Sequence, residues 1–173
     1  MQVLKSDITS GEYKSYYEKY LNRVESNTEL FQALEEKSEL ADFFLALPLK
    51  KHDFSYADGK WTPKQILQHL LDTERIFSNR ALRFSRFDFT ELPGYDENHY
   101  AEHCFSKQRS ITDLVEEFEV LRSSTISLFR SFLPEVYANT GQASGGPLSV
   151  RSIPFILTGH QKHHIHIIQE RYL

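Results

Sequence analysis

Residues 60–77, KWTPKQILQHLLDTERIF, contain the clearest helix start in this sequence of 173 residues. Thr62 is a residue type that caps helix N-termini, and Pro63 at the first helical position costs no hydrogen bond. Apolar or small side chains then recur at the helical period, at Ile66, Leu70, Thr73, Ile76 and Phe77. The pattern predicts a helix that runs from Thr62 to about Ser85.

Four other segments also show the helical period. They are an N-terminal segment over residues 13–24 and segments over residues 28–47, 110–134 and 149–173. The expected inner face of the segment 28–47 is Leu30, Phe31, Leu34, Ala41 and Leu45. Ser110 or Thr112 is expected to cap the third of these helices, and Ser149 the last.

The links between these segments predict the topology. Residues 86–107 show no sustained period and form a long connection, and residues 139–147 are small, polar and pliable. No run alternates in a way that predicts a strand. Because a link as long as 86–107 can cross the length of a bundle, we expect an all-α four-helix bundle with one long crossover, plus an extra N-terminal helix. The chain length suits a single domain over residues 1–173.

The composition narrows the class of protein. The chain carries 20 Lys and Arg against 24 Asp and Glu, a net charge of −4, without the basic stripe that nucleic-acid binding needs. Its only cysteine, Cys104, excludes an intramolecular disulfide and is typical of a reducing compartment. No apolar run has the length of a signal peptide or a membrane span, so the expected location is the cytoplasm, with no membrane partner.

Histidine is the residue in excess, since four of the eight lie in GHQKHHIH, residues 159–166. On a helix, His160 and His164 project from the middle of the apolar stripe one turn apart, a spacing that lets both rings reach one ion. Two imidazoles hold a divalent ion weakly, so a third ligand is needed. The candidate is His69, which lies at the edge of the apolar stripe of the helix predicted over residues 62–85. His163 is an alternative ligand, and from spacing alone hydrogen-bonded core histidines explain the pattern equally well.

Few other residues are candidates for chemistry. Asp72 lies one turn from His69 and is the candidate catalytic acid–base group, with a helix-supporting acid as the alternative. The loop Asp96-Glu97-Asn98 either lies over the metal or forms an acidic turn, and Cys104 is a free thiol beside a histidine. The sequence lacks a G-x-S-x-G elbow, a phosphate-binding loop, a dinucleotide fingerprint and an HExxH motif, which argues against those enzyme classes.

Three segments together resemble the DinB-like (damage-inducible) superfamily. Residues 60–74, KWTPKQILQHLLDTE, resemble its W-[ST]…H-L-x-D-x-E signature. Residues 92–98, LPGYDEN, resemble the loop that follows this helix, and residues 159–164, GHQKHH, resemble the C-terminal G-H-x-x-H-H element. The three motifs keep the order and spacing of the family and span most of the chain.

The resemblance implies a four-helix bundle with a long crossover and a three-histidine site for a divalent metal, zinc or nickel, on His69, His160 and His164. It also implies homodimers in many members and, in some branches, transfer of a low-molecular-weight thiol to an electrophile. Three neutral imidazoles leave an ion its charge and an open position, so a bound thiol or water would lose its proton more readily. We therefore expect a metal-dependent S-transferase or hydrolase for a small electrophilic substrate, with a non-catalytic metal- or ligand-binding stress-response bundle as the alternative.

Overall fold

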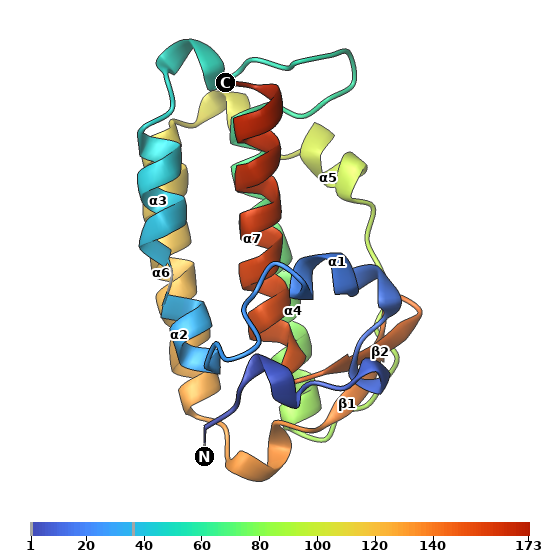
Figure 1. Ribbon diagram of the computed structural model, residues 1–173. Coiled ribbons are helices and arrows are strands. Elements are labelled where there is room, and N and C mark those ends of the chain that lie inside the picture. Colours follow the sequence, from blue (N-terminus) through green and yellow to red (C-terminus); the bar gives the residue numbers. More distant parts are fainter. Residues whose placement is uncertain (1, 36) are drawn as a thin grey trace.

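The computed structural model describes residues 2–35 and 37–173 and is a four-helix bundle with a small hairpin at one end (Figure 1). One corner of the bundle consists of two successive helices, α2 (Leu30–Glu35) and α3 (Lys37–Leu45). The other three corners are α4 (Pro63–Ser85), α6 (Ile111–Arg130) and α7 (Ser152–Arg171). Two short helices, α1 (Glu18–Leu21) and α5 (Glu97–Glu102), lie beside the bundle.

The helix directions confirm the predicted long crossover. In Figure 1, α2, α3 and α7 run upward, whereas α4 and α6 both run downward. Two successive helices that are parallel need a connection as long as the bundle, and residues 86–110, which include α5, return along its side. This connection places α5 and the loop before it next to α4 and α7.

Local capping explains why α4 and α6 begin where the sequence predicts. The Thr62 hydroxyl accepts a hydrogen bond from the Gln65 backbone N–H at 3.2 Å, and the Gln65 side chain accepts one from the Thr62 N–H at 2.9 Å. Ser110 and Asp113 form the same reciprocal arrangement at the start of α6. Each pair satisfies two N–H groups that the helix leaves without partners, and the predicted starts are confirmed.

The extra N-terminal helix is present, but it is much shorter than the predicted range of residues 13–24. Residues up to Tyr17 form short 3₁₀ turns, and only α1 (Glu18–Leu21) is α-helical. Tyr13 forms an isolated antiparallel bridge with Leu148, and Tyr16 is 50% exposed. The tyrosines therefore pack through contacts with distant parts of the chain and not along one face of a helix.

A second correction concerns the segment predicted to be a pliable link without strands. Thr140–Ala143 (β1) and Gly146–Ser149 (β2) form an antiparallel hairpin. Its turn residues, Ser144 and Gly145, have φ values of 55° and 73°, the left-handed backbone that two-residue hairpin turns require. Helix α7 consequently starts at Ser152, although the Ser149 hydroxyl still accepts a hydrogen bond from the Ser152 N–H at 3.2 Å.

The helix predicted over residues 28–47 corresponds to α2 and α3, and residue 36 lies outside the described residues. Leu30, Leu34 and Ala41 are buried as expected, but Leu45 is 52% exposed and does not belong to the inner face. Its position at the last residue of α3 explains the error, because the chain then turns toward Pro48 and the end of the bundle.

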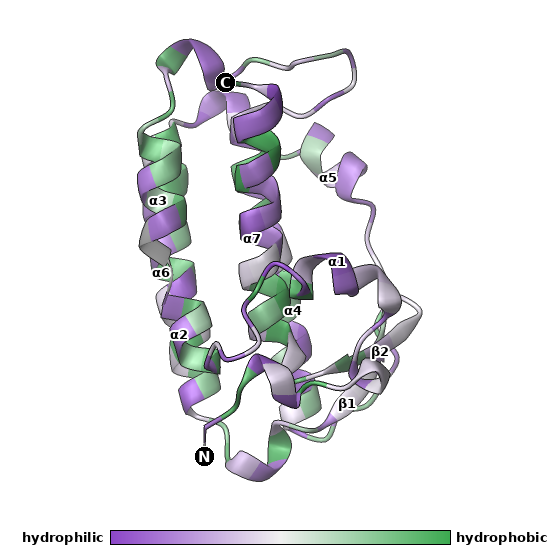
Figure 2. Ribbon diagram, viewed as in Figure 1, coloured by the Kyte–Doolittle hydropathy of each residue, from purple (hydrophilic) through white to green (hydrophobic). Residues whose placement is uncertain are grey.

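The bundle has two apolar clusters. Hydrophobic and hydrophilic residues alternate along its helices (Figure 2). One cluster lies near the hairpin, and the other lies near the C-terminus. In the polar layer between them, Arg122 donates two hydrogen bonds to Glu74, at 2.8 and 2.9 Å, and one to the Leu34 carbonyl at 3.1 Å. Within the described residues, no helix is both long and apolar enough to cross a bilayer.

Gly159 lets α1 approach α7 more closely than any other residue could. A Cβ atom at this position would lie 2.0 Å from the Tyr20 carbonyl oxygen, a backbone atom that cannot move aside. Gly159→Ala is therefore expected to lower the free energy of unfolding by about 1–3 kcal/mol, measured by urea denaturation. Gly11→Ala is the matched control, because a Cβ there meets nothing within 4 Å. Equal stability of the two variants would contradict the close contact.

Candidate metal centre

Three histidines from two helices meet at the level between the apolar clusters. His69 comes from α4, and His160 and His164 come from α7, one turn apart. The Nε2 atom of His160 lies 3.1 Å from that of His69 and 3.0 Å from that of His164. The donor atoms of all three lie within 4.8 Å of one another, and we call this group the triad.

Burial keeps the triad in the neutral form that binds metals. His69 is 7% exposed and His160 is 5% exposed. Burial lowers the pKa of His69 to about 4. Burial, followed by the nearby histidines, also lowers the pKa of His160 and of His164 well below the usual range. At neutral pH each ring therefore offers a nitrogen lone pair.

The donor set fits a divalent cation better than it fits a hydrogen-bonded cluster. A hydrogen bond joins one N–H to one lone pair, so the single Nε2 of His160 cannot serve two neighbouring Nε2 atoms as well as an ion can. Zinc–nitrogen distances of about 2.0–2.1 Å in a tetrahedron correspond to nitrogens about 3.3 Å apart. The His69 ring faces the other two histidines through Nε2, and its buried Nδ1 has no hydrogen-bond partner among the described residues.

The lowered pKa values predict how the metal-free protein responds to acid. An unfolded histidine binds a proton with a pKa of about 6.5, whereas folded His69 does so only near 4. Between these values the unfolded chain holds more protons, so stability is constant above about pH 6.5 and falls as the pH drops toward 4. Urea unfolding after chelation, at pH 7.5 and pH 5, measures this loss. In His69→Leu the loss should be smaller, and an unchanged loss would contradict the assignment.

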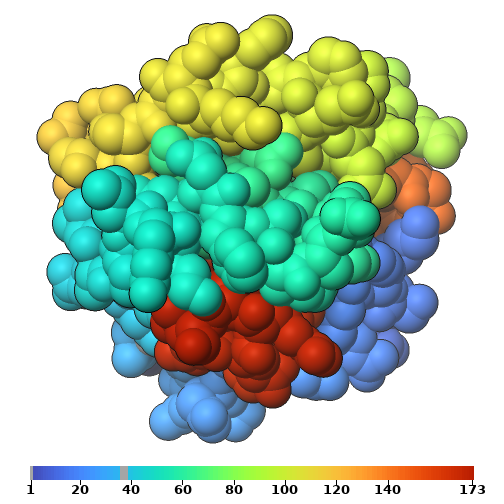
Figure 3. Space-filling view, turned by 90° about the horizontal axis from the view of Figure 1, so that it is seen from above, coloured from blue at the N-terminus to red at the C-terminus, as the bar shows by residue number. Residues whose placement is uncertain are grey.

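A cavity of about 490 Å³ adjoins the triad. Its walls come from the N-terminal segment, α4, the loop before α5, the hairpin turn and α7. The connection over residues 46–62 covers the end of the bundle between the ends of α7 and α6 (Figure 3). The cavity lies at the side of the bundle and not at this covered end, because its lining residues come from the long crossover, the hairpin turn and the helices beside them.

Two aromatic side chains that the sequence did not point to flank the triad. The Tyr20 ring lies 4.8 Å from the His160 ring, and the Trp61 ring lies 4.8 Å from the His69 ring, centroid to centroid. Trp61 also stacks on His164 with an angle of 22° between the rings. The place of Trp61 just before the helix that carries His69 could have indicated that it lies near the triad. No local pattern in the sequence indicates that Tyr20 contacts α7.

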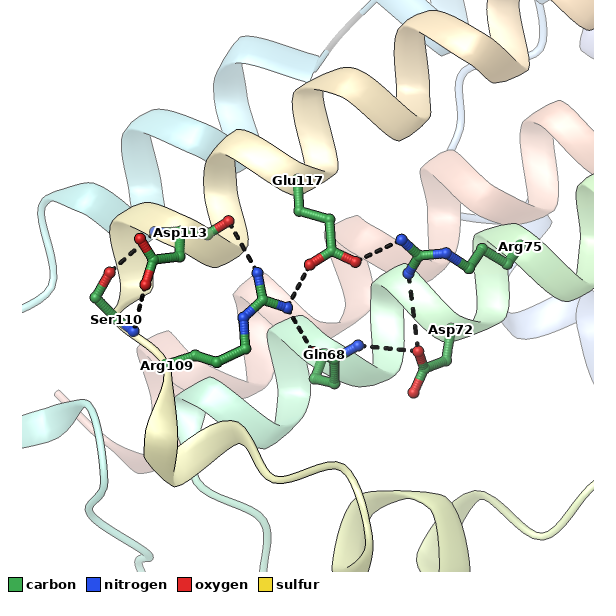
Figure 4. A network of polar contacts seen from close by, with 7 residues as sticks. All are labelled: Gln68, Asp72, Arg75, Arg109, Ser110, Asp113 and Glu117. Carbon is green, nitrogen blue, oxygen red and sulfur yellow. Dashed lines mark hydrogen bonds and ion pairs between the residues drawn. The ribbon is translucent and has the colours of Figure 1, made fainter.

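Asp72, predicted to be catalytic, is not brought to the triad and does not line the cavity. It accepts a hydrogen bond from the Gln68 side chain at 2.9 Å and lies 3.9 Å from Arg75 (Figure 4). Arg75 in turn pairs with Glu117 of α6. This network joins α4 to α6, so the position of Asp72 favours the helix-supporting alternative, and its catalytic role stays an untested prediction.

The remaining candidates lie around the cavity in different ways. His163 is half-buried and lines it, 5.5 Å from the Tyr20 ring, but is not one of the three converging residues. Asp96 caps α5 by accepting from two backbone N–H groups, while Glu97 and Asn98 line the cavity. The Cys104 thiol donates to a backbone carbonyl of α5 and does not line the cavity.

Comparison with known proteins agrees with this description. The sequence profile of the DinB superfamily matches residues 32–168. Among solved structures, this chain is similar to YfiT from Bacillus subtilis, which is described as a probable metal-dependent hydrolase with an unusual four-helix bundle topology. The two sequences are 20% identical, and the structures superpose with a TM-score of 0.74 over 94% of this chain and 89% of that chain. At this identity the likeness concerns the fold. No curated protein matches this chain in sequence.

Proposed function

This chain belongs to the DinB superfamily, and we propose that it is a metal-dependent enzyme in which His69, His160 and His164 hold a divalent ion that activates a thiol or water toward a small electrophilic substrate. The observation that carries the proposal is the convergence of three neutral imidazoles, two of them buried and one partly buried, beside a cavity. A structural site would need no such space, whereas catalytic zinc sites keep a position open next to a substrate pocket.

The chemistry divides between the ion and the chain. A bound ion at this site supplies Lewis-acid chemistry, lowering the pKa of a thiol or water that occupies its open position. The rings of Trp61 and Tyr20 pack against the triad and limit the water that reaches it. The hydroxyls of Thr73 and Tyr95 share a hydrogen bond of 2.7 Å in the cavity wall, which leaves one hydroxyl proton to donate to a substrate and orient it.

Both reactions of the proposal have support. The cavity of about 490 Å³ is within the size range of small-molecule sites and has room for a substrate beyond a single water, as transfer of a thiol to an electrophile requires. The name of the structural neighbour YfiT, a probable metal-dependent hydrolase, favours attack by water. Imidazole ligands suit zinc and nickel, which we propose as the ions to test.

The test is a comparison of rates in metal-loaded protein. Conjugation of low-molecular-weight thiols to chlorodinitrobenzene or monobromobimane measures S-transfer, and cleavage of nitrophenyl esters measures hydrolysis. We expect a rate that chelation removes, that zinc or nickel restores, and that His164→Ala lowers by at least about 100-fold. His166→Ala on the same helix is the control, because His166 is half-exposed and pairs with Glu170. A rate indifferent to chelation and to His164→Ala, or no rate with any substrate, would overturn the proposal.

A further inference from the structure

The cavity beside the triad has a cationic end that metal binding does not use. Its lining includes three basic side chains, Lys14, Lys19 and Arg80, against a single carboxylate, Glu97. Arg80 lies on α4, eleven residues beyond His69, which corresponds to about 16 Å along the helix. A molecule in the cavity could therefore contact the triad with one end and Arg80 with the other.

Arg80 is a buried charge without an acidic partner. Its side chain belongs to a residue that is only 2% exposed. The Nη2 atom donates to the Pro93 carbonyl at 3.1 Å and to the Ser144 hydroxyl at 2.9 Å. The Nη1 atom is buried and has no hydrogen-bond partner, and no carboxylate of the described residues forms an ion pair with this guanidinium.

Two other arginines of the described chain, the fully buried Arg122 and the partly buried Arg151, show what is missing at Arg80. Arg122 forms two hydrogen bonds with Glu74, and Arg151 forms two with Glu12. Buried charges are costly unless a counter-charge and hydrogen bonds compensate them, and proteins rarely keep one uncompensated without a use for it. Arg80 has two hydrogen bonds to neutral groups and lies over the Phe77 ring, 5.0 Å from its centroid, but it has no counter-charge, which indicates a ligand that brings its own negative charge.

The polar groups that contact Arg80 are neutral, and a second cation, Lys14, lies near them. Lys14 donates to the Ser144 carbonyl at 2.9 Å, which holds the hairpin turn at the cavity. Burial raises the pKa of Tyr17, against the opposing effect of Arg80 and Ser144, so this hydroxyl keeps its proton beside them. Both N–H groups of Nη2 are used within the chain, so the guanidinium offers an oxyanion the unpartnered Nη1, from which it accepts a charge-assisted hydrogen bond.

We propose that Arg80, supported by Ser144 and Tyr17, is an anion-binding subsite, and that molecules bound in this cavity present a carboxylate or phosphate group to it. The subsite is a binding property of the chain by itself. Its consequence for substrates rests on the function proposed above: the preferred thiol or electrophile carries an acidic group within about 16 Å of the atom that reacts at the triad.

Binding of simple oxyanions tests the subsite separately from catalysis. The full-length protein, both metal-loaded and after chelation, is titrated with inorganic phosphate and with succinate in separate arms, and affinity is measured by calorimetry or by the rise in Tm. We expect at least one of them to bind with and without metal, and Arg80→Met to weaken that binding by at least about 10-fold. The arm that responds identifies the oxyanion.

Two controls keep the result interpretable. Arg86→Met removes the same charge near the end of α4 from an exposed residue outside the cavity, and its oxyanion affinity should equal that of the wild type. Arg80→Lys keeps the positive charge but lacks the planar guanidinium, and we expect an oxyanion affinity between those of the wild type and Arg80→Met. Equal affinity in wild type and Arg80→Met, or no binding of either oxyanion to the wild type, would overturn the subsite. Neither outcome bears on the metal-dependent rate, which chelation and His164→Ala decide.

Discussion

His160→Ala is expected to reduce the metal content of the purified protein from one ion per chain to almost none. The Nε2 atom of His160 lies between those of the other two ligands, 3.1 and 3.0 Å away, so its loss leaves two imidazoles with no third nitrogen near them. Affinity should fall by more than about 100-fold, the upper range for groups that only orient a ligand. Plasma mass spectrometry of the zinc- and nickel-loaded protein, with a competing chelator titration, measures both quantities.

The matched control is again a histidine of α7. His166 is 46% exposed at its side chain and pairs with Glu170 at 3.3 Å, away from the triad. His166→Ala should keep the full metal content. If His160→Ala bound as much metal as His166→Ala, the ion would lie elsewhere and the triad would be a packed group of neutral rings.

Arg122→Met is expected to lower the free energy of unfolding by about 3–5 kcal/mol. The two side chains of the Arg122–Glu74 pair are 0% and 1% exposed, and the variant would leave the Glu74 carboxylate without its counter-charge between the two apolar clusters. The Leu34 carbonyl would also lose its donor. Urea or guanidinium denaturation measures the change.

An exposed ion pair that also involves an arginine of α6 provides the control. Arg130 and Glu35 lie 2.8 Å apart but are 62% and 53% exposed, so Arg130→Met should cost less than about 1 kcal/mol. The double variant Arg122→Met/Glu74→Met should recover most of the loss, because no unpaired charge remains. A loss in Arg122→Met as small as in Arg130→Met would contradict the role of the buried pair.

The parts of the fold that could be predicted depend on contacts close in sequence. The starts of α4 and α6 follow from Thr62 with Gln65 and from Ser110 with Asp113, each three residues apart. The N-terminal segment and the hairpin could not be predicted this way. Tyr13 pairs with Leu148 of the hairpin, and Lys14 donates a hydrogen bond to the hairpin turn. The N-terminal segment and the hairpin therefore stabilise each other through contacts that are distant in sequence.

The same distinction applies to the site. His160 and His164 share one helix, and their spacing indicated a common ion. His69 was a candidate because it lies at the edge of the apolar stripe of another helix, and the family resemblance implied the same residue. Tyr20 and Arg80 were missed because their roles arise only when α1 meets Gly159 and the hairpin turn meets α4. Asp72 was chosen for its nearness to His69 in sequence, but its side chain points to the network with α6.

The most direct test of the three-histidine site is an anomalous difference map from crystals of the zinc- or nickel-loaded protein, recorded above the absorption edge of the metal. The geometry of His69, His160 and His164 predicts one strong peak per chain, about 2.0–2.1 Å from one ring nitrogen of each. A fully loaded protein whose anomalous peak lies elsewhere, with none between these three rings, would contradict it.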